Sequence, residues 1–103
     1  MIMVNATLEP KEGKTAEIIE KADTLLKASR EHKGNVSYNL YENVEDNTLM
    51  FVERWKCLKG LQKHMQTEEF LSFGQEIKDL LKSELSVKIY EADLITDDSV
   101  LGK

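Results

Sequence analysis

The side chains that could carry chemistry are concentrated in one stretch, residues 48–73, which reads TLMFVERWKCLKGLQKHMQTEEFLSF. One of the two histidines, His64, lies there beside the apolar positions Leu61 and Met65. These positions favour a short helix packed on a sheet, so that the imidazole could reach the space between them. Histidine titrates near neutral pH and can accept a proton from a substrate. We therefore take His64 as a candidate catalytic residue, with a boundary histidine of no chemical role as the alternative.

Three further residues, Asn5, Trp55 and Glu53, carry a group that can form hydrogen bonds and stand among apolar neighbours. Asn5 lies in an apolar first strand, and a buried amide must find partners, which could be a substrate oxygen or only backbone and water. Asn5 is therefore the second candidate catalytic residue, as the holder of a substrate oxygen. Trp55, the only tryptophan, ends a strand and could bind substrate or belong to the core. Glu53 is expected to pair with a basic residue or a backbone amide.

Aromatic side chains are also placed where they could face an aromatic ligand. The candidate substrate-binding residues of this kind are Tyr38, Phe51, Phe70 and Phe73. At their spacings, a position in an ordinary hydrophobic core is the alternative.

Several common kinds of active site are absent from the sequence. Neither G-x-x-x-x-G-K-[ST] nor G-x-G-x-x-G is present, so no nucleotide-binding loop is predicted. His32 and His64 are far apart in the sequence, and neither stands at a metal-binding spacing from Cys57. On one helix, Cys57 and His64 would be separated by a rise of about 10 Å, too far for a nucleophilic pair. We therefore expect no bound metal and no cofactor.

Length and composition limit the class of protein. A chain of 103 residues with 41% hydrophobic and 32% charged residues is typical of one soluble globular domain. The net charge of −5, without a basic stripe, argues against nucleic-acid binding. No apolar run approaches the length of a membrane helix, and the first residues do not resemble a signal peptide. Because Cys57 is the only cysteine, no intrachain disulfide is possible, and we expect a cytoplasmic protein.

Hydrophobic periodicity predicts the order of the elements. Strands are predicted over residues 2–8, 36–43, 49–55 and 85–94, and a long helix over residues 14–31. A short helix is predicted over residues 58–65, followed by a second long helix that starts at Thr67 and continues to Leu81. Strand, helix, strand, strand, helix, strand is the ferredoxin-like α+β plan with an antiparallel sheet. We expect one domain, residues 1–95, and a flexible C-terminal tail, residues 96–103.

The strands alternate in a way that makes both faces of the sheet apolar. Two helices can cover only one face, which should be the face that carries Val4, Ala6 and Phe51. The opposite set of positions comprises Met3, Asn5, Tyr41, Met50, Val52, Tyr90 and Ala92. An exposed apolar patch of that size usually marks an interface. We therefore expect a homodimer in which a second copy covers this face, with burial inside a monomer as the alternative.

Three short motifs resemble the antibiotic biosynthesis monooxygenase (ABM) family, which belongs to the dimeric α+β barrel superfamily. Residues 33–41, KGNVSYNLY, resemble the family's glycine-apolar-x-tyrosine strand, and residues 51–55, FVERW, resemble its V-E-x-W signature. The third resemblance is to L-x-x-H-x-x-[ST]-x-x-F, matched by Leu61, His64, Thr67 and Phe70. The motifs occur in the family's order, and the pattern to which they belong spans nearly the whole chain.

The resemblance implies a homodimer in which each subunit has its own pocket between helices and sheet. It implies an oxygenation that needs neither metal nor flavin, because an electron-rich phenol, anthrone or quinol loses a proton and then activates oxygen itself. Asn5, Trp55 and His64 occupy positions that resemble those lining family pockets. The expected partners are therefore a small aromatic substrate, oxygen and a second copy of the chain.

Two positions depart from the family pattern. Many members carry histidine directly before the helix phenylalanine, where this chain has Glu69, which argues against a proton relay. Haem-degrading relatives bind iron through a histidine at the position that matches Gly74, which argues against haem. A non-catalytic small-molecule-binding or stress-response dimer, and a haem-degrading protein, are the alternatives to a monooxygenase.

Overall fold

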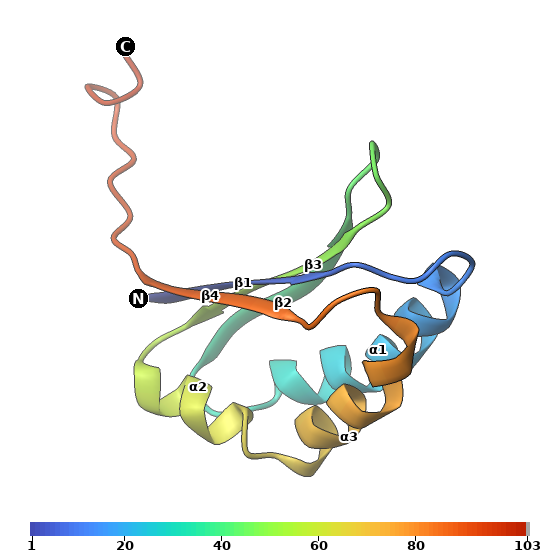
Figure 1. Ribbon diagram of the computed structural model, residues 1–103. Helices are drawn as coiled ribbons and strands as arrows, with labels where there is room; N and C mark the ends of the chain where they lie inside the picture. Colours follow the sequence, from blue (N-terminus) through green and yellow to red (C-terminus); the bar gives the residue numbers. More distant parts are fainter. Residues whose placement is uncertain (103) are drawn as a thin grey trace.

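The computed structural model, which describes residues 1–102, has one antiparallel sheet with its helices on one face (Figure 1). The elements are β1 (Ile2–Leu8), α1 (Thr15–Arg30), β2 (Asn35–Glu42), β3 (Leu49–Trp55), α2 (Leu58–His64), α3 (Glu68–Ile77) and β4 (Ser86–Glu91). The four strands lie in the order β2-β3-β1-β4. This arrangement confirms the predicted ferredoxin-like α+β fold.

The hydrophobic core lies between the sheet and the helices. Strand register aligns Val4 with Glu53 and Ala6 with Phe51, so these side chains point to the helical side. Helix α1 contributes Ile18, Ala22 and Leu25 from one face, as its spacing predicts, and packs against α3. The buried residues of the core are Val4, Ala6, Leu8, Ile18, Ala22, Leu25, Tyr38, Leu49, Phe51, Trp55, Leu61, Phe73, Ile77 and Leu81.

Helix α3 begins as predicted but ends earlier. The Thr67 hydroxyl accepts a hydrogen bond from the backbone N–H of Phe70 at 3.4 Å, which caps the helix. The helix ends at Ile77 and is followed by a 3₁₀ turn, so the prediction that it continues to Leu81 was wrong. The reason is tertiary, because Leu81 forms a β-bridge with Pro10, near the end of β1. A residue paired in this extended geometry cannot continue a helix.

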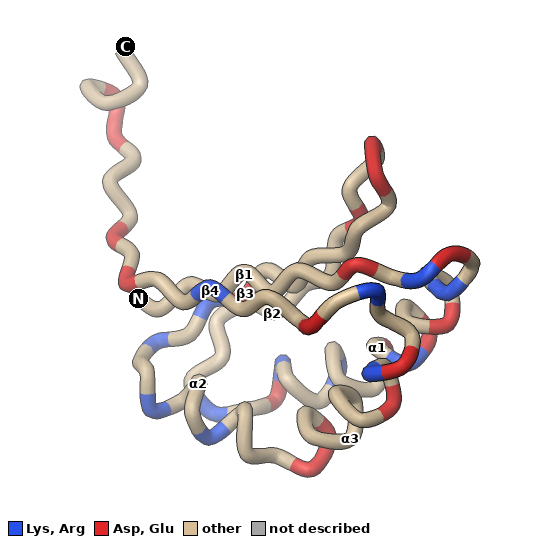
Figure 2. The backbone as a smooth tube through the Cα atoms, in the orientation of Figure 1, with Lys and Arg blue, Asp and Glu red and all other residues tan. Residues whose placement is uncertain are grey.

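The other face of the sheet is covered by no element within residues 1–102 (Figure 1). Register places Met3, Thr7, Met50 and Val52 on this face of β1 and β3. Tyr41 of β2 and Tyr90 of β4 lie there too and are 56% and 45% exposed. Charged residues lie mainly outside the strands, and Lys and Arg gather around α2 (Figure 2). This side of the sheet therefore carries a group of apolar and aromatic side chains together with polar ones, which include Asn5, Arg54 and Lys88.

Strand β4 is an edge strand, and the chain runs away from the fold beyond it (Figure 1). On the helical side of β4, Val87 and Ile89 are 44% and 46% exposed. The helices therefore leave the β4 edge of the core open. Part of the predicted tail, Lys103, lies outside the described residues. Among the helices of residues 1–102, none has the length and apolar character needed to cross a membrane.

Candidate functional site

A close approach of two backbone segments brings the two histidines together. The loop after α1 turns at Gly34, whose φ of +87° suits glycine. The loop packs on α2 at Gly60, where an added Cβ would lie 3.2 Å from the carbonyl oxygen of Lys33. The backbone N–H of Lys56 donates to the carbonyl oxygen of Gly34 at 2.8 Å, which fixes the loop against the end of β3. His32 in this loop is thereby held against α2.

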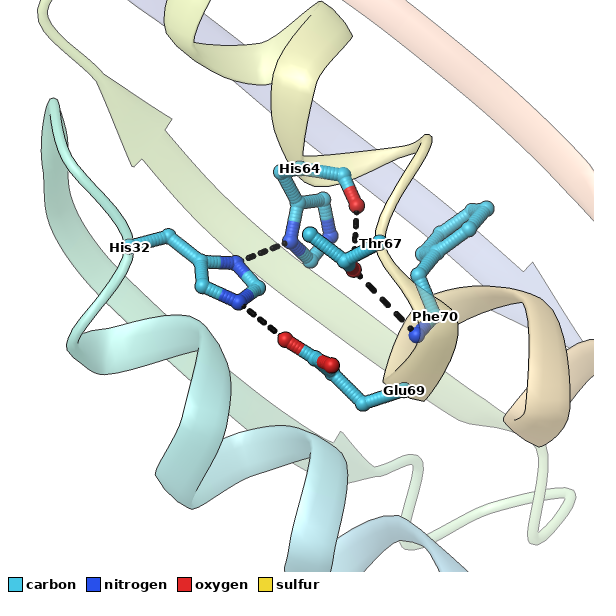
Figure 3. A network of polar contacts seen from close by, with 5 residues as sticks. All are labelled: His32, His64, Thr67, Glu69 and Phe70. Carbon is cyan, nitrogen blue, oxygen red and sulfur yellow. Dashed lines mark hydrogen bonds and ion pairs between the residues drawn. The ribbon is translucent and has the colours of Figure 1, made fainter.

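Three side chains from three parts of the chain form a hydrogen-bonded network (Figure 3). Nδ1 of His64, at the end of α2, lies 2.9 Å from Nδ1 of His32. Nε2 of His32 contacts the carboxylate of Glu69, in the first turn of α3, at 2.5 Å. The sequence interpretation gave the two histidines no relationship and took Glu69 as evidence against a relay. Tertiary packing connects all three groups, a relationship that the sequence interpretation did not include.

His64 is deeply buried, not a boundary residue. Its side chain is 1% exposed and packs against three aromatic rings, Trp55, Tyr38 and Phe70, at centroid distances of 4.8, 5.1 and 5.1 Å. Burial lowers the pKa of His64 to about 4, and His32 adds to this effect while Glu69 opposes it. The ring is therefore neutral near pH 7. Its Nε2 has no hydrogen-bond partner among residues 1–102.

His64 forms part of the wall of a hollow between the sheet and α2 and α3. The aromatic candidates Tyr38, Phe51, Phe70 and Phe73 all line this hollow. The space open to the centre of a water-sized sphere is about 50 Å³, and the whole hollow with its open mouth is about 500 Å³. The larger value includes open solvent, so the enclosed space is small, and binding of an aromatic molecule requires the lining side chains to move. The mouth lies toward β4, where Leu85 and Val87 complete the lining.

Glu53 is a second titratable group on the same wall. It is 4% exposed, and Nε1–H of Trp55 donates to its Oε1 at 3.0 Å. The partner is thus an indole, and the expectation of a basic residue or a backbone amide was wrong. Burial raises the pKa of Glu53 to about 7, although the indole hydrogen bond acts in the opposite direction. Near neutral pH, a large fraction of Glu53 is a neutral carboxylic acid that can donate a hydrogen bond.

Two sequence candidates lie elsewhere. Asn5 aligns with Val52 and Lys88 on the face that points away from the helices, so the structure does not bring it to His64. The cause is strand alternation, which sends Val4 inward and Asn5 outward. Trp55 is fully buried and stands behind the lining residues, where it contacts His64 and holds Glu53. Trp55 is therefore placed to position other residues of the site.

Tyr38 lines the hollow, and its hydroxyl lies near Ser29 of α1. Burial and the nearby Glu53 carboxylate raise the pKa of Tyr38 far above its ordinary value. The phenol therefore stays protonated and can serve as a hydrogen-bond donor. The backbone of Tyr38 is held by Arg30, whose Nε–H donates to its carbonyl oxygen at 3.0 Å.

Comparison with known proteins identifies the family. The family model for antibiotic biosynthesis monooxygenases matches residues 1–76. The chain belongs to the ABM family. It is 35% identical over 88 residues to "Putative monooxygenase YcnE" of Bacillus subtilis, covering 84% of this chain and 93% of that protein.

Solved structures share the ABM fold. Rv0793 from Mycobacterium tuberculosis matches with a TM-score of 0.85 at 22% identity, over 92% of this chain and 98% of that one. SO0527 from Shewanella oneidensis matches with a TM-score of 0.79 at 26% identity, over 86% of this chain and 87% of that one. Within the described part of this ABM chain, no group of three or more His, Cys, Asp or Glu side chains could hold a metal ion.

Gly74 of the ABM domain lines the hollow from α3. A Cβ added there would meet nothing within 4 Å, so the position leaves open space where a larger residue would fill the hollow. Sequence reasoning selected His64 and the four aromatic residues that line the hollow, but it did not include His32, the contact of Glu69 with His32 or the Trp55–Glu53 pair. The glutamate in place of the family's histidine was the available signal, because a carboxylate there can bind a histidine supplied from elsewhere.

Proposed function

We propose that this protein is a monooxygenase that oxidises a phenol-, quinol- or anthrone-like aromatic with molecular oxygen, using no bound metal or flavin. The observation that carries the proposal is the Nε2 atom of His64, buried and without a partner at the wall of an apolar, aromatic hollow. A buried polar atom without a hydrogen bond is costly, and a bound substrate hydroxyl would supply the bond. ABM family membership supports the same reaction class.

The reaction begins with loss of a substrate proton. Nε2 of His64 accepts this proton, and the resulting electron-rich anion reacts with oxygen. For an anthrone, the CH2 group becomes C=O: one atom of O2 enters the product, and the other leaves as water with the two hydrogens. The apolar walls exclude bulk water from the reactive anion.

Glu53 takes the role first assigned to Asn5. It shares the hollow with His64, whereas Asn5 lies on the other face of the sheet. As a neutral acid, Glu53 donates a hydrogen bond to a substrate oxygen, such as the second oxygen of a quinol or the carbonyl of an anthrone. Tyr38, Phe51, Phe70 and Phe73 provide flat apolar walls for the rings. A quinol therefore places one oxygen at His64 and the other at Glu53, whereas an anthrone places its CH2 group at His64 and its carbonyl at Glu53.

The functional unit is a homodimer in this proposal. The face opposite the helices carries a group of apolar and aromatic side chains, namely Met3, Met50, Val52, Tyr41 and Tyr90. A second sheet packed there would bury these side chains from both copies. Each subunit keeps its own hollow on the helical side.

Oxygen uptake with a panel of hydroquinones and anthrones tests the proposal. A substrate should consume one O2 per molecule, and mass spectrometry with ¹⁸O2 should find one labelled oxygen atom in the product. Ligands that bind without consuming oxygen would instead indicate a non-catalytic binding protein. Tight haem binding with a Soret band would favour the haem-degrading alternative.

A further inference from the structure

The low basicity of His64 raises a question about where the substrate proton goes. A positive charge on a fully buried imidazole is unfavourable, and the pKa of about 4 expresses that cost. A base this weak would return the proton to a phenolate before oxygen could react. The charge must therefore leave the hollow, and the hydrogen bonds of His64 give it one route.

The positions of the protons on the two rings follow from Glu69. Glu69 is ionised near neutral pH, because its own backbone N–H and the His32 ring lower its pKa. A carboxylate can only accept hydrogen bonds, so Nε2 of His32 carries a proton and donates a hydrogen bond to Glu69. When His32 is neutral, its Nδ1 is therefore a bare acceptor and must receive Nδ1–H of His64. Nε2 of His64 is then unprotonated, which is the form that a base requires.

The alternative protonation state reverses these roles. When His32 is a cation, its Nδ1–H donates to Nδ1 of His64 across the same 2.9 Å contact. His64 stays neutral but now carries its proton on Nε2. The protonation state of His32 thus decides whether His64 presents a base or a donor to the hollow.

We propose that His32 and Glu69 form a proton relay that fixes the base tautomer of His64 and carries the substrate proton out of the hollow. This inference rests on the proposed function. His32 and Glu69 act as positioning and relay residues, since neither lines the hollow and only His64 touches the substrate. The relay runs from the end of α2 through the loop after α1 to the first turn of α3 (Figure 3).

The transfer balances protons and charge. A substrate O–H proton moves to Nε2 of His64 while the Nδ1 proton of His64 moves to Nδ1 of His32. The products are a substrate anion, a neutral His64 with Nε2–H and a His32 cation beside the Glu69 carboxylate. The His32 and Glu69 side chains are 17% and 31% exposed, so the proton can pass from His32 to water. The positive charge never needs to reside on the buried ring.

Other groups that face the network could also titrate. Glu69 faces it from α3, and Tyr38 and Glu53 line the hollow from the sheet. Tyr38 stays protonated, which leaves Glu53 as the group that titrates near neutral pH in the same hollow. Lys63 precedes His64 on α2 and is exposed. Glu53→Gln therefore separates the effect of Glu53 from that of His32.

Imidazole ¹⁵N NMR of the full chain tests the relay without any substrate. The chain has only two histidines, so two ring systems appear, and His32→Asn assigns them. While His32 is neutral, His64 should have a bare Nε2 and a protonated Nδ1. When acid has protonated His32, the proton of His64 should lie on Nε2 while the His64 ring remains neutral. The swap should persist in Glu53→Gln.

Two matched variants test whether the negative charge of Glu69 is the one that affects His32. Glu69→Gln keeps an oxygen acceptor but removes the negative charge, so the tautomer swap should move to lower pH. Glu68→Gln removes a neighbouring exposed charge that makes no bond to His32 and should leave the swap in place. Once a substrate is known, His32→Asn should lower turnover by about 10²-fold, because asparagine can accept from Nδ1–H of His64 but cannot take its proton.

Two outcomes would overturn the relay. One is a His64 that carries its proton on Nε2 while His32 is neutral, and the other is a His64 tautomer that is the same whether His32 is neutral or protonated. Failure of the proposed function looks different, since the NMR swap would be present and no aromatic would consume oxygen. Normal turnover by His32→Asn would reject the relay while leaving the monooxygenase intact.

Discussion

His32 and His64 face each other through their Nδ1 atoms at 2.9 Å, although they belong to a loop and a helix on opposite sides of the β2–β3 hairpin in the sequence. The contact depends on glycine at two places. Gly34 turns the loop with a positive φ, and Gly60 lets the loop backbone approach α2. Backbone contacts therefore hold the loop against α2, and a side-chain hydrogen bond joins the two rings.

Gly34→Ala should weaken this contact. A Cβ at a φ of +87° is strained, and the expected loss of stability is about 1 kcal/mol. The loop should shift, and His64 should lose its preference for the bare Nε2. Gly13→Ala is the control, since Gly13 also has a positive φ of +77° but nothing lies within 4 Å of its added Cβ. Equal effects of both variants on the ¹⁵N spectrum would refute the role given to Gly34.

His64→Asn should separate catalysis from stability. The asparagine amide can replace the hydrogen bond that Nδ1 of His64 makes with His32. No atom replaces Nε2 as the proton acceptor, so turnover should fall by roughly 10²–10⁴-fold. Leu61→Ala on the same helix is the control for lost packing, because Leu61 is 1% exposed. That change should cost about 2–5 kcal/mol in urea unfolding. Turnover unchanged in His64→Asn would mean that the substrate proton leaves by another route.

Glu53 should make the free energy of unfolding depend on pH. Its pKa rises from 4.5 to about 7 on folding, so the folded state binds more protons between these values. Stability is therefore lost as pH rises from about 4.5 to 7, by at most about 3 kcal/mol. Glu53→Gln cannot ionise, and its amide oxygen can still accept from Trp55.

The stability of Glu53→Gln relative to the parent should therefore increase between pH 5 and pH 8. Urea unfolding of both proteins at one concentration measures the difference. A difference that stays constant with pH would show that Glu53 is not shifted.

Gly74→Leu should fill the hollow without harming the fold. The added side chain meets open space, and replacing a mid-helix glycine favours the helix by roughly 0.5–1 kcal/mol. We expect the thermal midpoint to be unchanged or raised, while binding of aromatic ligands and oxygen uptake are lost. Gln75→Leu, at the exposed neighbouring position, should retain both. A fully active Gly74→Leu would place the substrate site outside this hollow.

Light scattering should give roughly twice the chain mass of 11.8 kDa. Val52→Glu would bury a charge in the proposed interface and should yield monomers, because an unpaired buried charge costs several kcal/mol. Leu71→Glu changes an apolar residue of α3 that is 54% exposed, on the helical side, and should remain dimeric. A monomeric parent protein over a wide dilution range would reject the dimer.

The positions of Asn5 and Glu53 relative to the site could have been predicted from the sequence. The alternation that places Val4 inward also sends Asn5 outward, so the sequence alone argued against pairing Asn5 with His64. Glu53 lies two residues from Trp55 on the same side of a strand, which brings the carboxylate within reach of the indole N–H. Both relationships follow from the alternation of side chains along a single strand, so they could be predicted from the sequence.

The sequence by itself determined the elements, their order and the apolar face of each, because periods of two and of 3.6 residues are local properties. It also identified His64 and the aromatic walls. Only the tertiary structure decided that His64 is buried and that His32 and Glu69 complete its hydrogen bonds. Their meeting depends on how the α1 loop, α2 and α3 pack, and no periodicity encodes the distance between residues from three separate elements.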